Sequence, residues 1–106
     1  MIDYCEKILT YTKGLKHEAF SADTLVYDAI LRNLVLIGEA AIHIPDDIRG
    51  AHPEIYWRRF IATRHRLAHG YPGIDVDVIW DVIRTDVPNQ LPELRNLLNE
   101  VKEESG

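Results

Sequence analysis

Residues 21–43, with the sequence SADTLVYDAILRNLVLIGEAAIH, decide the fold. An α-helix turns 100° per residue, so the polar side chains of this segment fall within one stripe about 60° wide. The stripe consists of Asp28, Arg32, Glu39 and His43. The other positions are almost all apolar, and a helix with so wide an apolar surface must pack against more than one neighbour. The segment therefore predicts the central helix of a bundle.

The helices around this segment are marked by residues that cap or stop a helix. Ser21 is the expected N-cap of the central helix, which reaches about His43 before Pro45 ends it. An earlier helix is expected from about residue 2 to residue 11. The prolines and the glycine within residues 44–53 predict a short helix or a turn there.

The C-terminal part of the chain also favours helices. Residues 74–78 alternate apolar and acidic side chains, which is compatible with a short strand. No partner strand exists elsewhere, so a helix from an N-cap at Asp75 to Val87 is favoured. A last amphipathic helix follows, with Pro92 in its first turn and Leu94 on its apolar face. We expect an all-α fold, an antiparallel bundle of four to five helices.

Length and composition describe one domain spanning residues 1–106. The hydrophobic fraction of 46% and the charged fraction of 27% are typical of soluble globular proteins. No uncharged stretch approaches the ~20 apolar residues of a membrane span, and the N-terminus carries acids where a signal peptide carries bases. The single cysteine, Cys5, excludes an intramolecular disulfide and a Cys-rich zinc site. We expect a cytoplasmic protein, not associated with membranes, that uses no cofactor and no metal.

The charge of the chain is unevenly distributed. The formal net charge is −5, which argues against a surface generally coated by nucleic acid. Residues 55–74, however, contain no acid and four arginines. A local basic segment on an acidic protein could receive phosphate, although a solvated helix face is the ordinary explanation for scattered arginines.

The wide apolar surface of residues 21–43 also bears on assembly. A chain of this length has few helices with which to cover it, so we expect a homodimer or a higher even-numbered oligomer. Gly38 lies within the apolar surface, where it would allow another helix to approach closely.

The segment from about Glu54 to His69 predicts a helix that carries unusual chemistry. Its apolar stripe includes Trp57, Phe60, Ile61, Leu67 and Ala68, and Arg64 falls in the middle of this stripe. A buried guanidinium requires an acid, a phosphate or a cleft. Glu39 is a candidate partner for Arg64, and the alternative is an ordinary helical pair with His43. His65, His69 and Arg58 share the flank of the stripe, where they can converge with Arg64.

This combination of residues suits RNA cleavage without a metal. Histidine titrates near neutral pH and can move the proton of the 2′-OH and that of the leaving group. Arginine binds phosphate oxygens through two N–H groups and keeps its charge. An Arg-x4-His pattern is weak alone, because basic residues at the end of a helix are also favoured by its dipole.

Ordered motifs along the chain resemble the HepT type of HEPN-domain protein. Residues 62–71, ATRHRLAHGY, are similar to the Arg-polar-x3-His-x-Tyr motif of that family. Upstream, residues 37–41 (IGEAA) and the pair Ile44-Pro45 agree with the family sequence, and so do residues 78–80 (VIW) and 86–88 (DVP) downstream. The agreement extends from about residue 30 to residue 95.

The resemblance implies an all-α, HEPN-like homodimer that is the toxin of a toxin–antitoxin pair. It implies a metal-independent endoribonuclease with Arg64 and His69 as catalytic residues in a cleft across the dimer, and an RNA substrate. It also implies a partner, an MNT-type nucleotidyltransferase antitoxin, which attaches AMP to the motif tyrosine, Tyr71. Arg58 and Arg66 are our candidates for binding RNA phosphates, with Glu39 in a supporting role.

The chain departs from the family pattern at one position. The residue after the arginine is most often Asn in such proteins, and here it is His65. His65 is compatible with orienting the site, with moving protons or with a solvated surface position. The alternative to an enzyme is a dimer that binds a nucleotide or RNA and serves as a partner or substrate of the nucleotidyltransferase.

Overall fold

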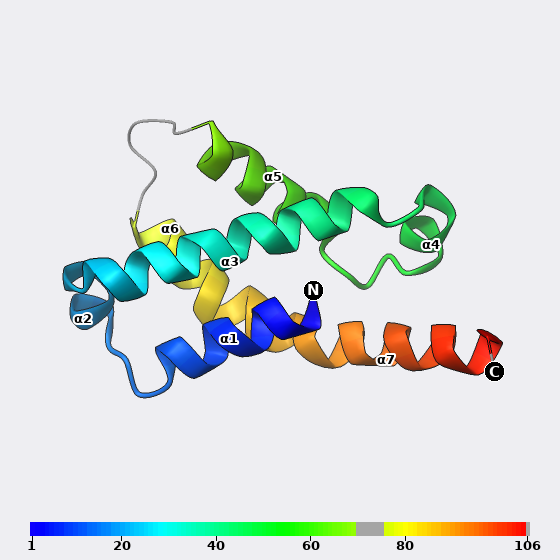
Figure 1. Cartoon of the computed structure of the whole chain (residues 1–106), viewed down its shortest axis with the longest axis horizontal. Coiled ribbons are helices and arrows are strands. Elements are labelled where there is room, and N and C mark those ends of the chain that lie inside the picture. The colour runs from blue at the N-terminus through cyan, green and yellow to red at the C-terminus, as the bar shows by residue number, and fades with distance from the viewer. Residues whose placement is uncertain (70–75, 106) are drawn as a thin grey trace.

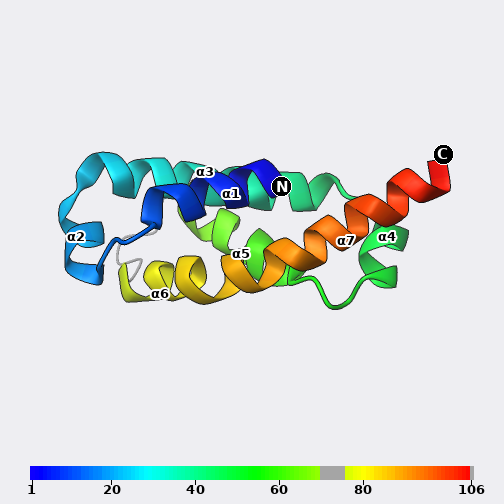
Figure 2. The ribbon, with the colours of Figure 1, turned by 90° about the horizontal axis from the view of Figure 1, so that it is seen from below.

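The computed structural model describes residues 1–69 and 76–105, and every element within these ranges is helical (Figure 1). The elements are α1 (Ile2–Thr12), α2 (His17–Ala22), α3 (Thr24–His43), α4 (Asp46–Ala51), α5 (Trp57–Ala68), α6 (Val76–Asp81), a π-helical segment (Val82–Asp86) and α7 (Val87–Ser105). The predicted all-α fold is confirmed. Figure 2 shows α1 and α3 in one layer, with α5, α6 and the first part of α7 beneath them.

The predicted central helix is α3, which packs against both α1 and α5. Its innermost side chains are almost fully buried: Ile30, Leu34, Ile37 and Ala41. Gly38 is buried on the side that meets α5, where a Cβ atom would lie 2.7 Å from the carbonyl oxygen of Phe60. The glycine therefore permits the close helix approach that the sequence suggested, and the approaching helix belongs to the same chain.

The predicted start of the central helix is wrong. Ser21 lies inside the separate short helix α2, and its hydroxyl donates to the carbonyl of Glu18. The N-cap of α3 is Asp23, whose carboxylate accepts the N–H of Val26 at 3.2 Å. A carboxylate at this position satisfies an N–H group that has no partner within the helix. Asp23 therefore starts a new helix here instead of continuing α2.

Helix α5 begins at Trp57, three residues after the predicted start at Glu54. The side chain of Gln90, which is 2% exposed, explains this boundary. Its Oε1 atom accepts the N–H of Tyr56 at 2.7 Å, and its Nε2 atom donates to the carbonyl of Glu54 at 3.2 Å. A buried side chain from a distant helix thus satisfies backbone groups before α5.

The predicted break before the last helix is also wrong, because helix runs from Val76 to Ser105 without interruption. Residues 82–86 have π-helical geometry, and the N–H of Val87 donates to the carbonyl of Val82. Pro88 has no N–H, and its ring would clash with the carbonyl of Arg84 in a regular α-helix, which gives the wider turn a physical reason. The alternative of a strand fails at residues 76–78, which are helical, whereas Asp75 lies outside the described residues.

The buried core is formed by side chains from every described helix except α4, together with Ile55 from the turn before α5. Cys5 is completely buried, and burial raises the pKa of its thiol to about 11. Trp57 is buried as predicted, while Ala68, which was expected in the apolar stripe of α5, is exposed. Within the described residues, no helix is long and apolar enough to cross a membrane.

Candidate active site

The candidate site is built on α5, whose C-terminal half carries Arg64, His65, Arg66 and His69. The Arg64 side chain is 30% exposed, and its Nε atom is buried without a hydrogen-bond partner among residues 1–69 and 76–105. An unsatisfied buried donor costs free energy. Arg64 is therefore a half-buried cation whose hydrogen-bond donors are not all satisfied, as expected from its place in the apolar stripe.

Glu39 on α3 is the acid that faces Arg64. Its Oε1 atom lies 3.7 Å from Nη2 of Arg64, close enough for an ion pair and too far for a good hydrogen bond. The structure thus brings together the pair suggested by the sequence. Because this contact is long and partly exposed, it leaves N–H groups of Arg64 available for an anion.

His65 and His69 stack one turn apart at the end of α5. Their ring centroids are 4.2 Å apart, with the planes inclined by 45°. Nδ1 of His69 lies 2.8 Å from the carbonyl oxygen of His65. A carbonyl only accepts hydrogen bonds, so Nδ1 carries the proton and Nε2 holds the lone pair of the neutral ring. In this tautomer Nε2 is the ring nitrogen that can accept a proton.

Arg64 and the two histidines lie on different flanks of α5. The Cβ and Cγ atoms of Arg64 are packed against Gly38 of α3, whereas His65 and His69 are exposed. Five residues correspond to about 7.5 Å of rise and a rotation of about 140°. A single α5 therefore does not point Arg64 and His69 in the same direction.

Arg58 and Arg66 are both exposed, and neither has an ion pair or hydrogen bond from its side chain within the described parts of the chain. Arg58 belongs to the first turn of α5 and Arg66 to its last turn. The two candidate phosphate ligands thus stand near opposite ends of the helix. Tyr71 lies outside the described residues.

One ionic contact of the basic segment was missed from the sequence. Nη1 of Arg59 donates to Oδ1 of Asp86 at 2.9 Å, and the guanidinium lies 5.2 Å from the ring centroid of Tyr56. Asp86 is 5% exposed at the end of the π-helical segment. Burial raises the pKa of Asp86, and Arg59 partly opposes this effect. The pairing joins residues 27 positions apart, so no local pattern could have revealed it.

The fold and this arrangement define a helical bundle with a half-buried arginine and a histidine pair on one helix, a set of groups suited to phosphodiester chemistry. Comparison with known families identifies the chain. The family model described as "Ribonuclease HepT-like" matches residues 1–101. The chain belongs to the HepT-like ribonuclease family.

Individual relatives agree with this family. A protein of Thermococcus cleftensis named "Probable ribonuclease HepT" is 39% identical over 84 residues, which cover 79% of this chain and 76% of the relative. A protein of Methanocaldococcus jannaschii named "Putative RNase" is 28% identical over 104 residues, covering 98% of this chain and 86% of the relative. No solved structure matches the chain with significant similarity.

Proposed function

We propose that this member of a ribonuclease family is an endoribonuclease that cleaves RNA by general acid–base catalysis without a metal ion. The observation that carries the proposal is the His69 ring, whose Nδ1 atom is bound to the His65 carbonyl at 2.8 Å so that Nε2 is the base. Arg64, with N–H groups left over, is the cation for the phosphate. The reaction requires a base for the 2′-hydroxyl proton and a fixed positive charge for the phosphate, and these two residues would supply them.

The proposed reaction is attack by the neighbouring 2′-hydroxyl. Nε2 of His69 takes the proton of the 2′-OH while O2′ forms a bond to phosphorus. The bond between phosphorus and O5′ breaks, the electron pair leaves with O5′, and a protonated imidazole returns a proton to it. Arg64 stabilises the negative charge that builds on the phosphoryl oxygens. The products are a 2′,3′-cyclic phosphate and a 5′-hydroxyl.

His65 has two possible roles in this scheme. Its ring is 4.2 Å from that of His69, so it is near enough to donate the proton to O5′, or it orients the site as asparagine does in most of the family. His65→Asn distinguishes these roles. A proton donor acts only when protonated, so its substitution would remove the alkaline limb of the pH–rate profile, whereas substitution of an orienting residue would leave that limb in place.

The proposal includes a homodimer with a composite cleft, as the family resemblance implies. Support comes from the geometry of α5, because Arg64 and His69 of one chain point about 140° apart. A second copy of α5 across a two-fold axis would bring the histidine flank of one chain to the arginine flank of the other. Glu39 would hold Arg64 in place until RNA phosphate replaces it.

The proposed biological role is that of the toxin in a pair with an MNT-type nucleotidyltransferase antitoxin. In this role the antitoxin would silence the enzyme by attaching AMP to Tyr71. The support is the sequence alone: Tyr71 follows His69 by two residues, and the segment around it contains no acid that would repel an AMP phosphate. Arg66 is in the last turn of α5, just before this segment.

RNA cleavage by purified protein tests the catalytic proposal. His69→Ala and Arg64→Ala are each expected to reduce cleavage by ~10² or more. EDTA is expected to leave the wild-type rate unchanged. Arg95→Ala is the matched control, because it removes an exposed arginine whose partner is Glu6 on α1. Cleavage that survives His69→Ala would contradict the mechanism, and a protein that binds RNA without cleaving it would favour the binding-module alternative.

A further inference from the structure

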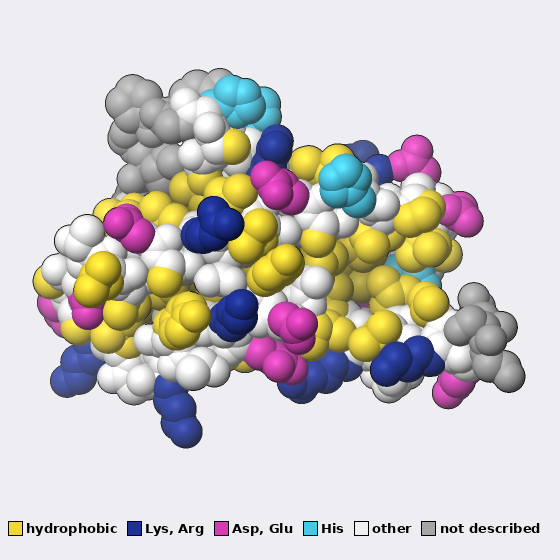
Figure 3. All heavy atoms as spheres, in the orientation of Figure 1, with side chains coloured by type: hydrophobic (Ala, Val, Ile, Leu, Met, Phe, Trp, Pro, Cys, Tyr) yellow, Lys and Arg dark blue, Asp and Glu magenta, His cyan; other side chains and the backbone are white. Residues whose placement is uncertain are grey.

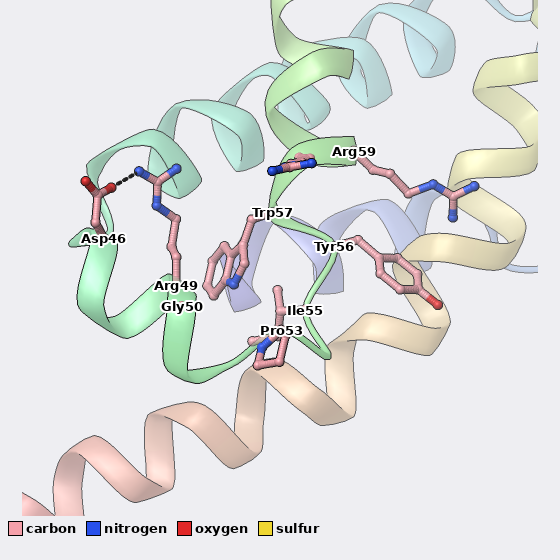
Figure 4. Close-up of a pocket in the computed structure, with 9 residues that line it drawn as sticks. Asp46, Arg49, Gly50, Pro53, Ile55, Tyr56, Trp57 and Arg59 are labelled. Atoms are coloured by element: carbon pink, nitrogen blue, oxygen red, sulfur yellow. Dashed lines mark hydrogen bonds and ion pairs between the residues drawn. The ribbon is translucent and has the colours of Figure 1, made fainter.

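The opposite end of α5 carries a second cationic feature. An open pocket of about 560 Å³ lies between α4 and the start of α5. Arg49 of α4 and Tyr56, Arg58 and Arg59 from the start of α5 are among its lining residues. Figure 4 shows Arg49 and Trp57 on one side and Tyr56 and Arg59 on the other. The pocket is some distance from the histidine pair, which lies at the other end of the helix (Figure 1).

The cations of this pocket have unused hydrogen-bond capacity. Arg49 pairs through Nη2 with Asp46, the sole acid among the described lining residues, while its Nε atom is buried with no hydrogen-bond partner in that part of the chain. Arg58 is exposed and has no ionic partner among residues 1–69 and 76–105. Arg49 is paired with Asp46 and Arg59 with Asp86, so Arg58 supplies the uncompensated positive charge of the lining, on a protein whose net charge is −5. An anion is the ligand that such a lining favours.

The wall of the pocket is fixed before any ligand arrives. Nε1 of Trp57 donates to the carbonyl of His52 at 3.0 Å, and the buried Gln90 accepts the N–H of Tyr56 at 2.7 Å. These bonds hold the turn between α4 and α5, so the pocket does not need to order a loop when it binds. A site that is already ordered loses less entropy on binding.

Arg58 of the pocket lies on the same flank of α5 as the histidine pair. At 100° per residue, Arg58, His65 and His69 fall within about 40° of one another. Ala62, exposed and small, lies beside this sector, about 40° from Arg58 and about 60° from His65. His69 follows Arg58 by 11 positions, which correspond to a rise of about 16 Å, a distance that several nucleotides of an extended strand can follow. Figure 3 shows histidine side chains gathered over the C-terminal end of α5.

We propose that the pocket between α4 and α5 is a second binding site for single-stranded RNA, used by the same strand that occupies the cleavage site. This inference rests on the proposed ribonuclease function. Arg49 and Arg58 bind a phosphate several nucleotides from the bond that is cut. The half-exposed Tyr56 ring and the Arg59 guanidinium, 5.2 Å from its centroid, offer a flat surface on which a base stacks. The site makes affinity depend on the length of the RNA.

Binding of RNA of graded length tests the inference. Fluorescence anisotropy on the His69→Ala protein would compare strands of about three and about eight nucleotides. Adding Arg49→Gln is expected to weaken the binding of the longer strand by ~3–10-fold. The slope of log affinity against log salt concentration should also become smaller by about 0.7, the amount expected for one phosphate contact on a single strand. The shorter strand should change much less. Arg49→Lys keeps the charge and should keep most of the salt slope, which separates loss of a phosphate contact from a local change in fold.

The matched control is Arg95→Gln, an exposed arginine of α7 outside the pocket, which should leave the affinity of both strands as in the parent protein. Equal losses for the short and the long strand on Arg49→Gln, or no loss for either, would overturn the second site. The proposed catalytic function is tested separately, by the cleavage assay. A protein that does not cleave RNA but shows the Arg49-dependent length effect would retain this site as a binding site.

Discussion

Gly38 of α3 lies directly against Arg64 of α5: a methyl group at position 38 would sit 2.1 Å from the Cβ atom of Arg64. No pair of carbon atoms is tolerated at that distance without movement of the backbone. The candidate catalytic arginine is therefore positioned by contact between two helices at their closest point. A single hydrogen atom on Gly38 allows Arg64 to leave the apolar interface with its guanidinium half exposed.

Gly38→Ala is expected to destabilise the protein and to displace Arg64. Alanine improves helix propensity by about 1 kcal/mol, but the added Cβ would also approach the Phe60 carbonyl at 2.7 Å, so overpacking dominates. The expected net loss in the free energy of unfolding is ~2 kcal/mol, measured by urea denaturation. Gly50→Ala in α4 is the control, because nothing lies within 4 Å of its added Cβ and the same propensity gain should appear unopposed. Equal effects of the two substitutions would contradict this account.

The assembly prediction concerns the mass of the particle in solution. The chain mass is 12.2 kDa, and a composite cleft requires two copies. Light scattering at micromolar concentration is expected to give about twice the chain mass or an even multiple of it. A monomer at these concentrations that still cleaves RNA would remove the composite cleft.

The regulatory prediction concerns Tyr71. Incubation with the neighbouring nucleotidyltransferase and ATP is expected to add mass in units of AMP to the peptide that contains Tyr71. The added phosphodiester carries a negative charge that the arginines of residues 55–74 attract, so modified protein should lose RNA cleavage. Mass spectrometry of wild type and Tyr71→Phe, together with the cleavage assay, checks both steps. AMP found on a different tyrosine, or modified protein with full activity, would refute the proposal.

The buried carboxyl of Asp86 predicts a pH dependence of stability. Burial raises its pKa above 3.8, the ordinary value for an aspartate, and Arg59 opposes this effect only in part. The folded protein therefore binds the proton more tightly than the unfolded chain, and this contribution to stability is present below the unfolded pKa and lost as pH rises through the folded pKa. Asp86→Asn removes the titration and keeps an oxygen for Arg59.

The measurement for Asp86 is a comparison of two unfolding curves. The stability of the wild type relative to Asp86→Asn is expected to fall as pH rises from below 3.8 through the raised pKa. The comparison removes the opposite trend from Glu54, whose pKa is lowered by its own backbone N–H and by His52. A difference that grows with pH would show that Arg59 outweighs burial.

The sequence predicted the features that depend on local periodicity, and it failed where distant side chains decide. The apolar surface of residues 24–43 and the position of Arg64 within the stripe of α5 follow from 100° spacing. The start of α5 did not follow, because Gln90, more than 30 residues away, satisfies the N–H of Tyr56. For the same reason the Arg59–Asp86 pair was not foreseen.

The apolar surface of α3 is a weak reason to expect a dimer. Both α1 and α5 pack against α3 within one chain, so much of that surface is covered without a second copy. The better reason for a dimer is the divergence of Arg64 and His69 around α5, which follows from their five-residue separation once the segment is known to be helical. In the sequence, histidines at the end of a helix are explained equally well by the helix dipole. The structure adds that Nδ1 of His69 is bound to the His65 carbonyl, which fixes the tautomer of the neutral ring.

The π-helical segment sets the rotation of α7 relative to α6 about the axis of the long C-terminal helix. A π-turn accommodates about one extra residue, and loss of one residue from 82–86 would rotate α7 relative to α6 by about 100°. Gln90 would then turn away from the start of α5, and its two bonds to the backbone of residues 54 and 56 would be lost. Substitution of an exposed residue in this segment leaves that register unchanged, whereas deletion of one residue changes which side of α7 meets α5. The number of residues in the π-helical segment therefore fixes the rotation of α7 relative to α6. The protein should not tolerate the loss of one residue here, although the side-chain hydrogen bonds and ion pair described for the segment go to Arg59 and Asp81 and not to the candidate catalytic residues.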